Sequence, residues 1–288
     1  MRYLDPAAVR AALPMADAIA AMRDAFGDDR EAPPRVRLGP SLFMPGRVGE
    51  RTGIKVVSTV PGNPVGIVMV FDEVGGPVGM LDGPTLTAIR TGAGAGLATD
   101  LLAPRDAATL AMLGAGAMAY DQVEAVRAVR PLTRVLVWSR TREKAEALAA
   151  RVGGEAVDDP FAAVHAADVV STATPARAPL FPAEMLQPGA HVNAVGAFTP
   201  EMVEIPAGVV RDAFVVVDDR EAAAAEAGDL LQAGREPDAT IADLLAGRIT
   251  APAGRTTFFK SVGIASQDVA AALAAMLRAD AGGLGVRL

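Results

Sequence analysis

The chain has 288 residues, of which 51% are hydrophobic and only 4% aromatic. This length accommodates one large or two ordinary domains, with cores built mainly from Ala, Val, Leu and Met. The formal net charge of -7 argues against a nucleic-acid partner held by phosphate neutralisation. The absence of cysteine excludes disulfides, thiolate nucleophiles and Cys-ligated metal sites.

The N-terminus has no basic segment followed by an apolar stretch, as a signal peptide would have. No apolar run approaches the roughly 18–20 residues of a membrane span. We therefore expect a cytoplasmic, soluble protein without a membrane partner. The two histidines, His165 and His191, are far apart in the chain, and we predict no metal site.

The first hundred residues combine helix signals with strand signals. Asp5 followed by Pro6 is typical of a helix N-cap and first turn. Two apolar runs flank Gly75-Gly76 and predict a β-hairpin. The predicted elements are helices from residue 5 and over 14–26, a strand that Arg35 begins, strands over 54–60, 67–71 and 78–81, and a helix over 85–103.

From residue 104 onwards strands and helices alternate. This alternation predicts a parallel sheet with right-handed crossovers. The predicted strands cover 108–113, 134–138, 155–157, 168–172, 191–194 and 214–217; the predicted helices cover 119–129, 141–152, 160–166, 221–227 and 264–279.

The pattern Gly114-x-Gly116-x-x-Ala119 follows a predicted strand and opens a predicted helix. The first glycine permits a tight turn, the second lets a pyrophosphate approach the backbone, and the small third residue allows close helix–strand packing. The helix N-terminus also presents N–H donors to phosphates. The context therefore predicts a dinucleotide site, with a structural glycine turn as the alternative.

The end of the second strand in this region distinguishes the two nicotinamide cofactors. NAD-specific sites usually carry Asp or Glu there to bind the ribose 2′-hydroxyl. Here the sequence reads Trp138-Ser139-Arg140-Thr141, and the planar fork of an arginine pairs well with a 2′-phosphate. We predict NADP(H), with NAD(H) possible, and hydroxyl contacts from Ser139 and Thr141. The alternative is that Arg140 is a solvated surface residue.

Three basic residues lie in apolar or small-residue surroundings in the first hundred residues: Arg35, Lys55 and Arg90. Three cations from separate segments could converge on a substrate carboxylate, to which arginine offers a bidentate contact. Alternation along the strand leaves open whether Lys55 points into a cleft or towards solvent.

Several further blocks resemble the ornithine cyclodeaminase/mu-crystallin family. The resemblance implies a doubly wound Rossmann domain over 106–261, and an α+β substrate and dimerisation domain formed by 1–105 with 262–288. It implies a homodimer. It also implies that Lys55 and Arg90 contact the substrate carboxylate and imine, with Arg35 as a further substrate residue. The matching blocks cover 53–57, 81–91, 113–119, 187–196, 226–229 and 256–263.

The sequence departs from the family at two site positions. Phe198 stands where cyclodeaminase-type members carry the proton-transferring Asp, and a phenyl ring cannot exchange protons. Met118 replaces the usual Gln. The predicted cofactor-binding residues are Thr91, Gly114, Gly116, Ala117, Met118, Ala119, Ser139, Arg140, Thr141, Thr174, Val195, Phe198 and Ser261.

These observations predict an oxidoreductase of amino-acid metabolism, an NADPH-dependent ketimine reductase. Its substrate would be a cyclic imine acid of the pyrroline-2-carboxylate or piperideine-2-carboxylate type, with Lys55 as the catalytic residue. Two alternatives remain on the same scaffold: an ornithine cyclodeaminase-type lyase and an amino-acid dehydrogenase. An alternative of another class is a non-catalytic, NADPH-dependent binding protein for small ligands.

Overall fold

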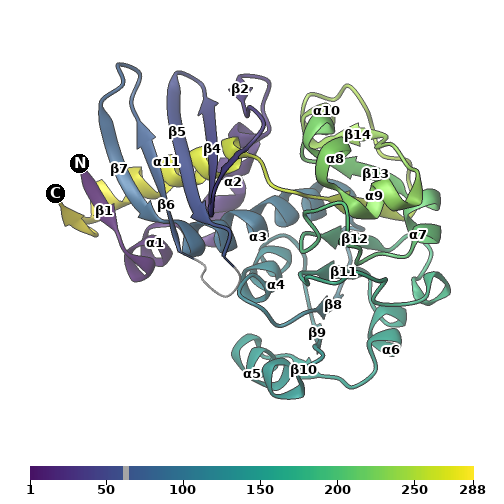
Figure 1. Cartoon of the computed structure of the whole chain (residues 1–288). Helices are drawn as coiled ribbons and strands as arrows, with labels where there is room; N and C mark the ends of the chain where they lie inside the picture. Colours follow the sequence, from purple (N-terminus) through teal and green to yellow (C-terminus); the bar gives the residue numbers. More distant parts are fainter. Residues whose placement is uncertain (61–64) are drawn as a thin grey trace. The chain divides into compact units, whose positions relative to one another are not determined.

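The computed structural model describes residues 1–60 and 65–288. It divides into two compact units (Figure 1). Unit 1 contains Met1–Ala93 and Ile264–Leu288, and unit 2 contains Gly94–Gly263. The chain passes from one unit to the other within helix α3 (Gly83–Leu102). Among the described residues, no helix is both long and apolar enough to cross a membrane.

Unit 1 is built on a mixed sheet. The predicted hairpin is confirmed: β6 and β7 pair antiparallel, and Gly75 in the turn adopts φ 81°. β1 and β7 are parallel, whereas the remaining pairs are antiparallel. The strand order is β16 (Val286–Arg287), β1 (Arg2–Leu4), β7 (Pro77–Asp82), β6 (Gly66–Phe71), β5 (Arg51–Ser58), β4 (Ser41–Val48) and β2 (Arg30–Glu31), with β3 (Val36–Leu38) also paired to β4.

Helices cover one face of this sheet. The predicted first helix is confirmed as α1 (Pro6–Ala12), which Asp5 caps by accepting from Ala8 N at 2.8 Å. Helix α2 (Met15–Ala25) packs against α11 (Ala265–Gly282), and α11 lies across β4, β5 and β6. Figure 1 shows α11, in yellow, running behind the strands of unit 1. The C-terminal helix thus shares a core with the N-terminal segment.

Small residues let α11 approach the sheet closely. A Cβ at Gly46 would come within 2.8 Å of Ala265 Cβ, and a Cβ at Gly53 within 2.9 Å of Val269 Cγ2. Any side chain at either position would therefore push the helix away. This close approach matters because both β5 and the first turn of α11 carry candidate site residues.

Unit 2 is an α/β unit whose eight strands are all parallel, as predicted. The order turns back at β8, so a crevice forms between the carboxyl ends of β8 and β11, where such folds bind ligands. The strand order is β10 (Glu155–Ala156), β9 (Arg134–Trp138), β8 (Thr109–Leu113), β11 (Val169–Thr172), β12 (His191–Ala194), β15 (Thr257–Lys260), β13 (Phe214–Val217) and β14 (Ala239–Thr240).

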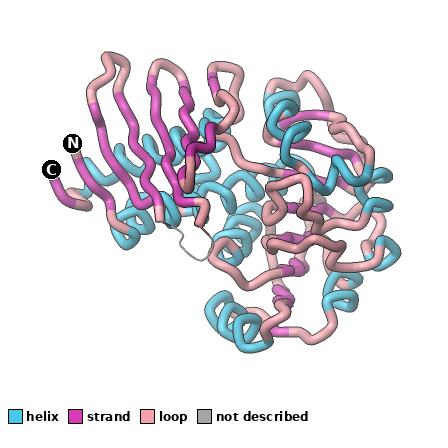
Figure 2. Tube along the Cα trace, in the orientation of Figure 1, coloured by secondary structure: helices cyan, strands magenta, loops and turns pink. Residues whose placement is uncertain are grey.

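Helices cover both faces of this sheet, which confirms the predicted doubly wound class. Along β8, Leu110 and Met112 join a cluster with α4 and α5, whereas Ala111 and Leu113 join the cluster on the opposite face. A strand buried on both faces reads as a continuous apolar run. Figure 2 shows the helices in cyan and the strands in magenta. The helices are α4 (Ala119–Val129), α5 (Arg142–Val152), α6 (Pro160–His165), α7 (Ala207–Asp212), α8 (Arg220–Glu226), α9 (Gly228–Ala233) and α10 (Ile241–Leu245), with the 3₁₀ turn η1 (Ala183–Met185).

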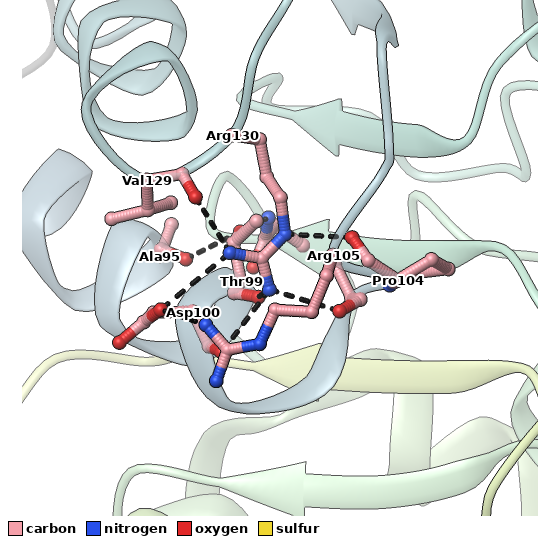
Figure 3. A network of polar contacts seen from close by, with 9 residues as sticks. Ala95, Thr99, Asp100, Pro104, Arg105, Val129 and Arg130 are labelled. Atoms are coloured by element: carbon pink, nitrogen blue, oxygen red, sulfur yellow. Dashed lines mark hydrogen bonds and ion pairs between the residues drawn. The ribbon is translucent and has the colours of Figure 1, made fainter.

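A buried arginine closes the end of α3. Arg130, which is 4% exposed, donates to the carbonyl oxygens of Thr99 and Pro104 at 2.7 Å and of Ala103 at 2.9 Å. Figure 3 shows the guanidinium of Arg130 with Thr99, Pro104 and Asp100 around it. The last carbonyls of a helix lack partners within the helix. Arg130 supplies donors to Thr99 and Asp100 in the last turn of α3 and to Ala103 and Pro104 just beyond it, and so stabilises this end of the helix.

Candidate active site

Two of the predicted substrate-binding cations meet at one carboxylate in unit 1. Lys55 Nζ lies 2.9 Å from Asp268 Oδ2, and Arg90 Nε donates to Asp268 Oδ1 at 2.9 Å. The three residues come from β5, α3 and α11, and they are 4%, 5% and 1% exposed. We call Lys55, Arg90 and Asp268 the charged cluster; with all three groups ionised, its net charge is one positive.

Strand geometry decides which way Lys55 points. Side chains alternate across a strand, and Gly53 and Lys55 are both buried on the face of β5 that α11 covers. The sequence leaves open whether the Lys55 side chain points inwards or towards solvent, and the structure shows that it is buried. A buried ammonium group is retained at low cost only when a charge partner is present, and Asp268 is that partner.

The first turn of α11 supplies the acceptors. Asp268 lies near the positive end of the helix dipole, which favours a carboxylate. Its neighbour Gln267 accepts from Ile264 N at 2.9 Å and from Arg90 Nη1 at 3.0 Å through the same oxygen. Arg90 is therefore held at two of its nitrogens by consecutive residues of one helix turn.

The surroundings of Lys55 change its pKa. Burial lowers the pKa of Lys55 from 10.5 to about 8; Asp268 opposes that change, whereas Arg90 and Arg35 reinforce it by repulsion. Burial alone would raise the pKa of Asp268, but Arg90 and Lys55 together hold it below its ordinary value. Lys55 thus titrates close to physiological pH, where an ammonium can give up a proton readily.

Arg35 is the third predicted substrate cation. It precedes β3 and is half-buried, and its charge contributes to the lowered pKa of Lys55. All three predicted substrate cations therefore lie in unit 1, on separate segments of the chain.

Unit 2 contains a pocket of about 410 Å³ at the carboxyl ends of β8, β9 and β11. This is the crevice at which the strand order turns back. The lining residues are Gly114, Ala115, Gly116, Trp138, Ser139, Arg140, Thr141, Lys144, Ala173, Thr174, Pro175, Ala176, Arg177, Ala178 and Leu180. Six predicted cofactor residues are among them: Gly114, Gly116, Ser139, Arg140, Thr141 and Thr174.

The glycines of the predicted motif have the properties that the motif needs. Gly114 adopts φ 114°, and a Cβ there would lie 2.8 Å from Ala173 O. Gly116 faces open space on the exposed side of the turn. Ala119 opens α4 and is fully buried in the cluster against β8. The turn is therefore tight at Gly114, accessible to a ligand at Gly116 and closely packed at Ala119.

The pocket is positively charged. Arg140, Lys144 and Arg177 line it, and no acidic side chain is found among its lining residues. Arg140 and Lys144 are both exposed; Arg140 directly precedes Thr141, the N-cap of α5, and Lys144 lies in the first turn of that helix. A pocket lined by cations and by no carboxylate favours an anionic ligand such as a phosphate.

A buried carboxylate organises the loops beside this pocket. Glu204 Oε1 accepts from Thr174 N and Thr174 Oγ1 at 2.7 and 2.8 Å, and Oε2 accepts from Gly196 N and Ala197 N at 2.9 and 3.0 Å. Burial raises the pKa of Glu204, although Lys260 and the Thr174 bonds act in the opposite direction. Glu204 thereby ties the loop after β11 to the loop after β12.

With this geometry established, comparison with known proteins assigns the chain. The model of the ornithine cyclodeaminase/mu-crystallin family matches residues 7–282. The chain belongs to this family.

Two curated members of the family are similar over most of their length. A Delta(1)-pyrroline-2-carboxylate reductase of Bacillus cereus is 39% identical over 266 residues, which cover 83% of this chain and 81% of the relative. Ketimine reductase mu-crystallin of Mus musculus is 37% identical over 217 residues, covering 75% and 69%. A solved Thermococcus litoralis Delta(1)-pyrroline-2-carboxylate reductase, in complex with NADH and L-proline, matches all of both chains with TM-score 0.92 and 27% identity.

The other predicted cofactor residues do not line the pocket of unit 2. Thr91 is buried on α3 within unit 1. Ser261 is buried and donates to Asp218 Oδ2 at 2.8 Å. Phe198, at the family's aspartate position, is 45% exposed. The remaining residues outside the pocket lining are Ala117, Met118, Ala119 and Val195.

Sequence reasoning missed five residues of these arrangements. Lys144 lies four residues after Arg140, in the predicted helix, and a basic residue there is a usable signal. The sequence identifies Trp138 only as the end of a strand. Arg177, Glu204 and Asp268 gave no local signal, because their partners lie far away in the chain.

Proposed function

We propose that this family member is a nicotinamide-dependent reductase of small cyclic ketimine carboxylates, of the pyrroline-2-carboxylate or piperideine-2-carboxylate type. The observation that carries the proposal is the full-length likeness to the reductase solved with NADH and L-proline. The buried charged cluster supports it, because Lys55 and Arg90 are suited to a carboxylate and an imine on one small ring.

The shape of the pocket in unit 2 supports dinucleotide binding. Gly114 leaves the space that a Cβ would fill against Ala173 O, and Gly116 exposes backbone at the start of α4. These residues would hold the pyrophosphate, and Ser139, Arg140 and Thr141 would hold the adenosine ribose end. When bound, the reduced cofactor supplies a hydride.

Unit 1 would provide the substrate contacts. Arg90, with Arg35, binds the carboxylate of the cyclic imine acid, and Lys55 donates a proton towards the ring nitrogen. Hydride adds to the imine carbon and the proton to the nitrogen, so the ketimine carboxylate becomes the cyclic amino acid. A protonated imine accepts hydride more readily, and this makes proton delivery by Lys55 Nζ the catalytic contribution of the chain.

The test is a turnover assay. The purified protein should consume NADPH when pyrroline-2-carboxylate or piperideine-2-carboxylate is added, with formation of proline or pipecolate measured by chromatography. Lys55→Met is the control and should abolish turnover while retaining nucleotide binding. Nucleotide binding without turnover on either imine would contradict the proposed activity and favour the binding-only alternative.

Preference for NADP(H) over NAD(H) belongs to the same proposal. Arg140 and Lys144, both exposed and both in the pocket lining, would pair with a 2′-phosphate. Arg140→Glu should lower kcat/KM for NADPH by about 10- to 100-fold, because a charge-assisted pair is replaced by repulsion. The kcat/KM for NADH should change little. Arg211→Glu, on α7 of the same unit and absent from the pocket lining, is the matched control. An unchanged NADPH/NADH ratio in Arg140→Glu would remove this assignment.

We also assign unit 1 the substrate-binding and dimerisation roles, and unit 2 the nucleotide-binding role. The homodimer would form through the sheet face of unit 1 that lies opposite its helices. A cytoplasmic location completes the proposal and is checked by cell fractionation.

A further inference from the structure

One carboxylate serves two cations in the charged cluster. Asp268 Oδ1 accepts from Arg90 Nε, and Oδ2 lies 2.9 Å from Lys55 Nζ. Each carboxylate oxygen is thus committed to one cation. Because Asp268 is only 1% exposed, water does not compete effectively for either oxygen.

The contacts leave the outer donors of both cations available. Arg90 uses Nε for Asp268 and Nη1 for Gln267, and its Nη2 makes no hydrogen bond within 1–60 and 65–288. Lys55 has three N–H donors, and its one ion pair in that part of the chain is with Asp268. The helix side of the cluster is therefore fixed, while N–H groups remain for a ligand.

We propose that Asp268 is a positioning residue that holds the Lys55 ammonium and the Arg90 guanidinium side by side and keeps Lys55 charged before substrate binds. This inference rests on the proposed function for its substrate, but the arrangement itself concerns unit 1 alone. Asp268 does not contact the reacting atoms; it acts through Lys55 and Arg90.

Removal of the Asp268 charge would leave two like charges buried together. Arg90 and Arg35 both repel the Lys55 ammonium, and burial acts in the same direction. Asp268 is the counter-charge that opposes these effects. Without it, Lys55 would lose its proton at a lower pH, and the substrate would meet a neutral amine in place of an ammonium.

Because the chain has few lysines, the charge state of Lys55 can be measured directly. Lys55, Lys144 and Lys260 are the only lysines in the chain, so a protein labelled with ¹⁵N-lysine has three Nζ signals. Lys55→Met assigns the Lys55 signal by its loss. The pH titration of that signal reports the charge of Lys55 without substrate, cofactor or turnover.

In Asp268→Asn, which keeps the side-chain shape but removes the charge, Lys55 should titrate at least about one pH unit lower than in the wild type. The alkaline limb of kcat should move by the same amount, with kcat reduced by about 10- to 100-fold. Asp17→Asn is the matched control, because Asp17 pairs with Arg278 on the exposed side of α11. It should leave both titrations unchanged.

Nucleotide binding verifies that the variants are folded. Trp138, the only tryptophan, lines the nucleotide pocket, so quenching of its fluorescence reports NADPH binding. If Asp268→Asn does not fold, Asp268→Glu tests the positioning role instead. This variant keeps the negative charge, so Lys55 should titrate as in the wild type. Because the longer side chain displaces the carboxylate, kcat should fall at least about tenfold.

An unchanged Lys55 titration in folded Asp268→Asn, or an unchanged kcat in Asp268→Glu, would overturn the positioning role. If the wild type turns over neither imine but Lys55 still titrates lower in Asp268→Asn, the proposed function fails and the positioning of the two cations stands.

Discussion

At the scale of the residue, Lys55 sets the pH dependence of the proposed reaction. The pKa of Lys55 is about 8, and the protonated form is the proton donor. A base is protonated below its pKa, so kcat should be constant below pH about 8 and should fall about tenfold per pH unit above it. The kcat profile with saturating NADPH and imine measures this, and Arg211→Gln, on α7 and outside the pocket lining, serves as the control. A profile that stays flat well above pH 8 would contradict this role.

The residues of the candidate site differ in how far the sequence could predict them. Arg140 was found because its place at the end of a strand has a known meaning in dinucleotide folds. The sequence identifies Lys55 as a candidate but does not show where its side chain points, since alternation along a strand is compatible with either face. Asp268 was not found, because its pairing with Lys55 and Arg90 joins residues about 180–210 positions apart. Long-range charge pairing leaves no periodic trace in a sequence.

At the scale of the element, the end of α3 depends on Arg130. Its guanidinium satisfies carbonyls of Thr99, Ala103 and Pro104 while nearly fully buried. Arg130→Met should lower the free energy of unfolding by about 2–4 kcal/mol, because several carbonyl groups at this helix end each lose a charge-assisted donor. Urea unfolding measures the loss. Arg105→Gln is the matched control, since Arg105 reaches the same Asp100 from an 81% exposed position, and it should unfold like the wild type. Equal stability of Arg130→Met and the wild type would show that other groups satisfy the helix end.

Elements with strong burial were the easiest to predict. The strands of unit 2 read as apolar runs because both faces are covered, and the predicted strands at 108–113, 134–138 and 191–194 are observed. β4 and β15 were not separately delimited. β4 contains Pro45 and Gly46, which normally weaken a strand. β15 ends in a buried Lys260 that pairs with Asp229 at 2.8 Å.

At the scale of the whole molecule, unit 1 presents an apolar sheet face. Residues that alternate with the helix-covered ones along β4 to β7 point to the other face. In register across the centre lie Ile54, Met69 and Met80. The face consists of Phe43, Pro45, Ile54, Val56, Ile67, Met69, Phe71, Val78 and Met80, all at least partly exposed. A contiguous apolar patch of this kind is typical of a protein interface, and a symmetric pair of such faces would be self-complementary.

The predicted homodimer can be tested at the centre of this face. Met69→Asp should convert the dimer to a monomer, because an isolated carboxylate would be buried between two apolar faces without a partner. Light scattering coupled to size-exclusion chromatography measures the mass, and circular dichroism verifies the fold. Val74→Asp is the control: Val74 lies in the β6–β7 turn and is 88% exposed, so the same charge there should leave the dimer intact. A monomeric wild type, or an unchanged mass in Met69→Asp, would place the subunit contact elsewhere or remove it.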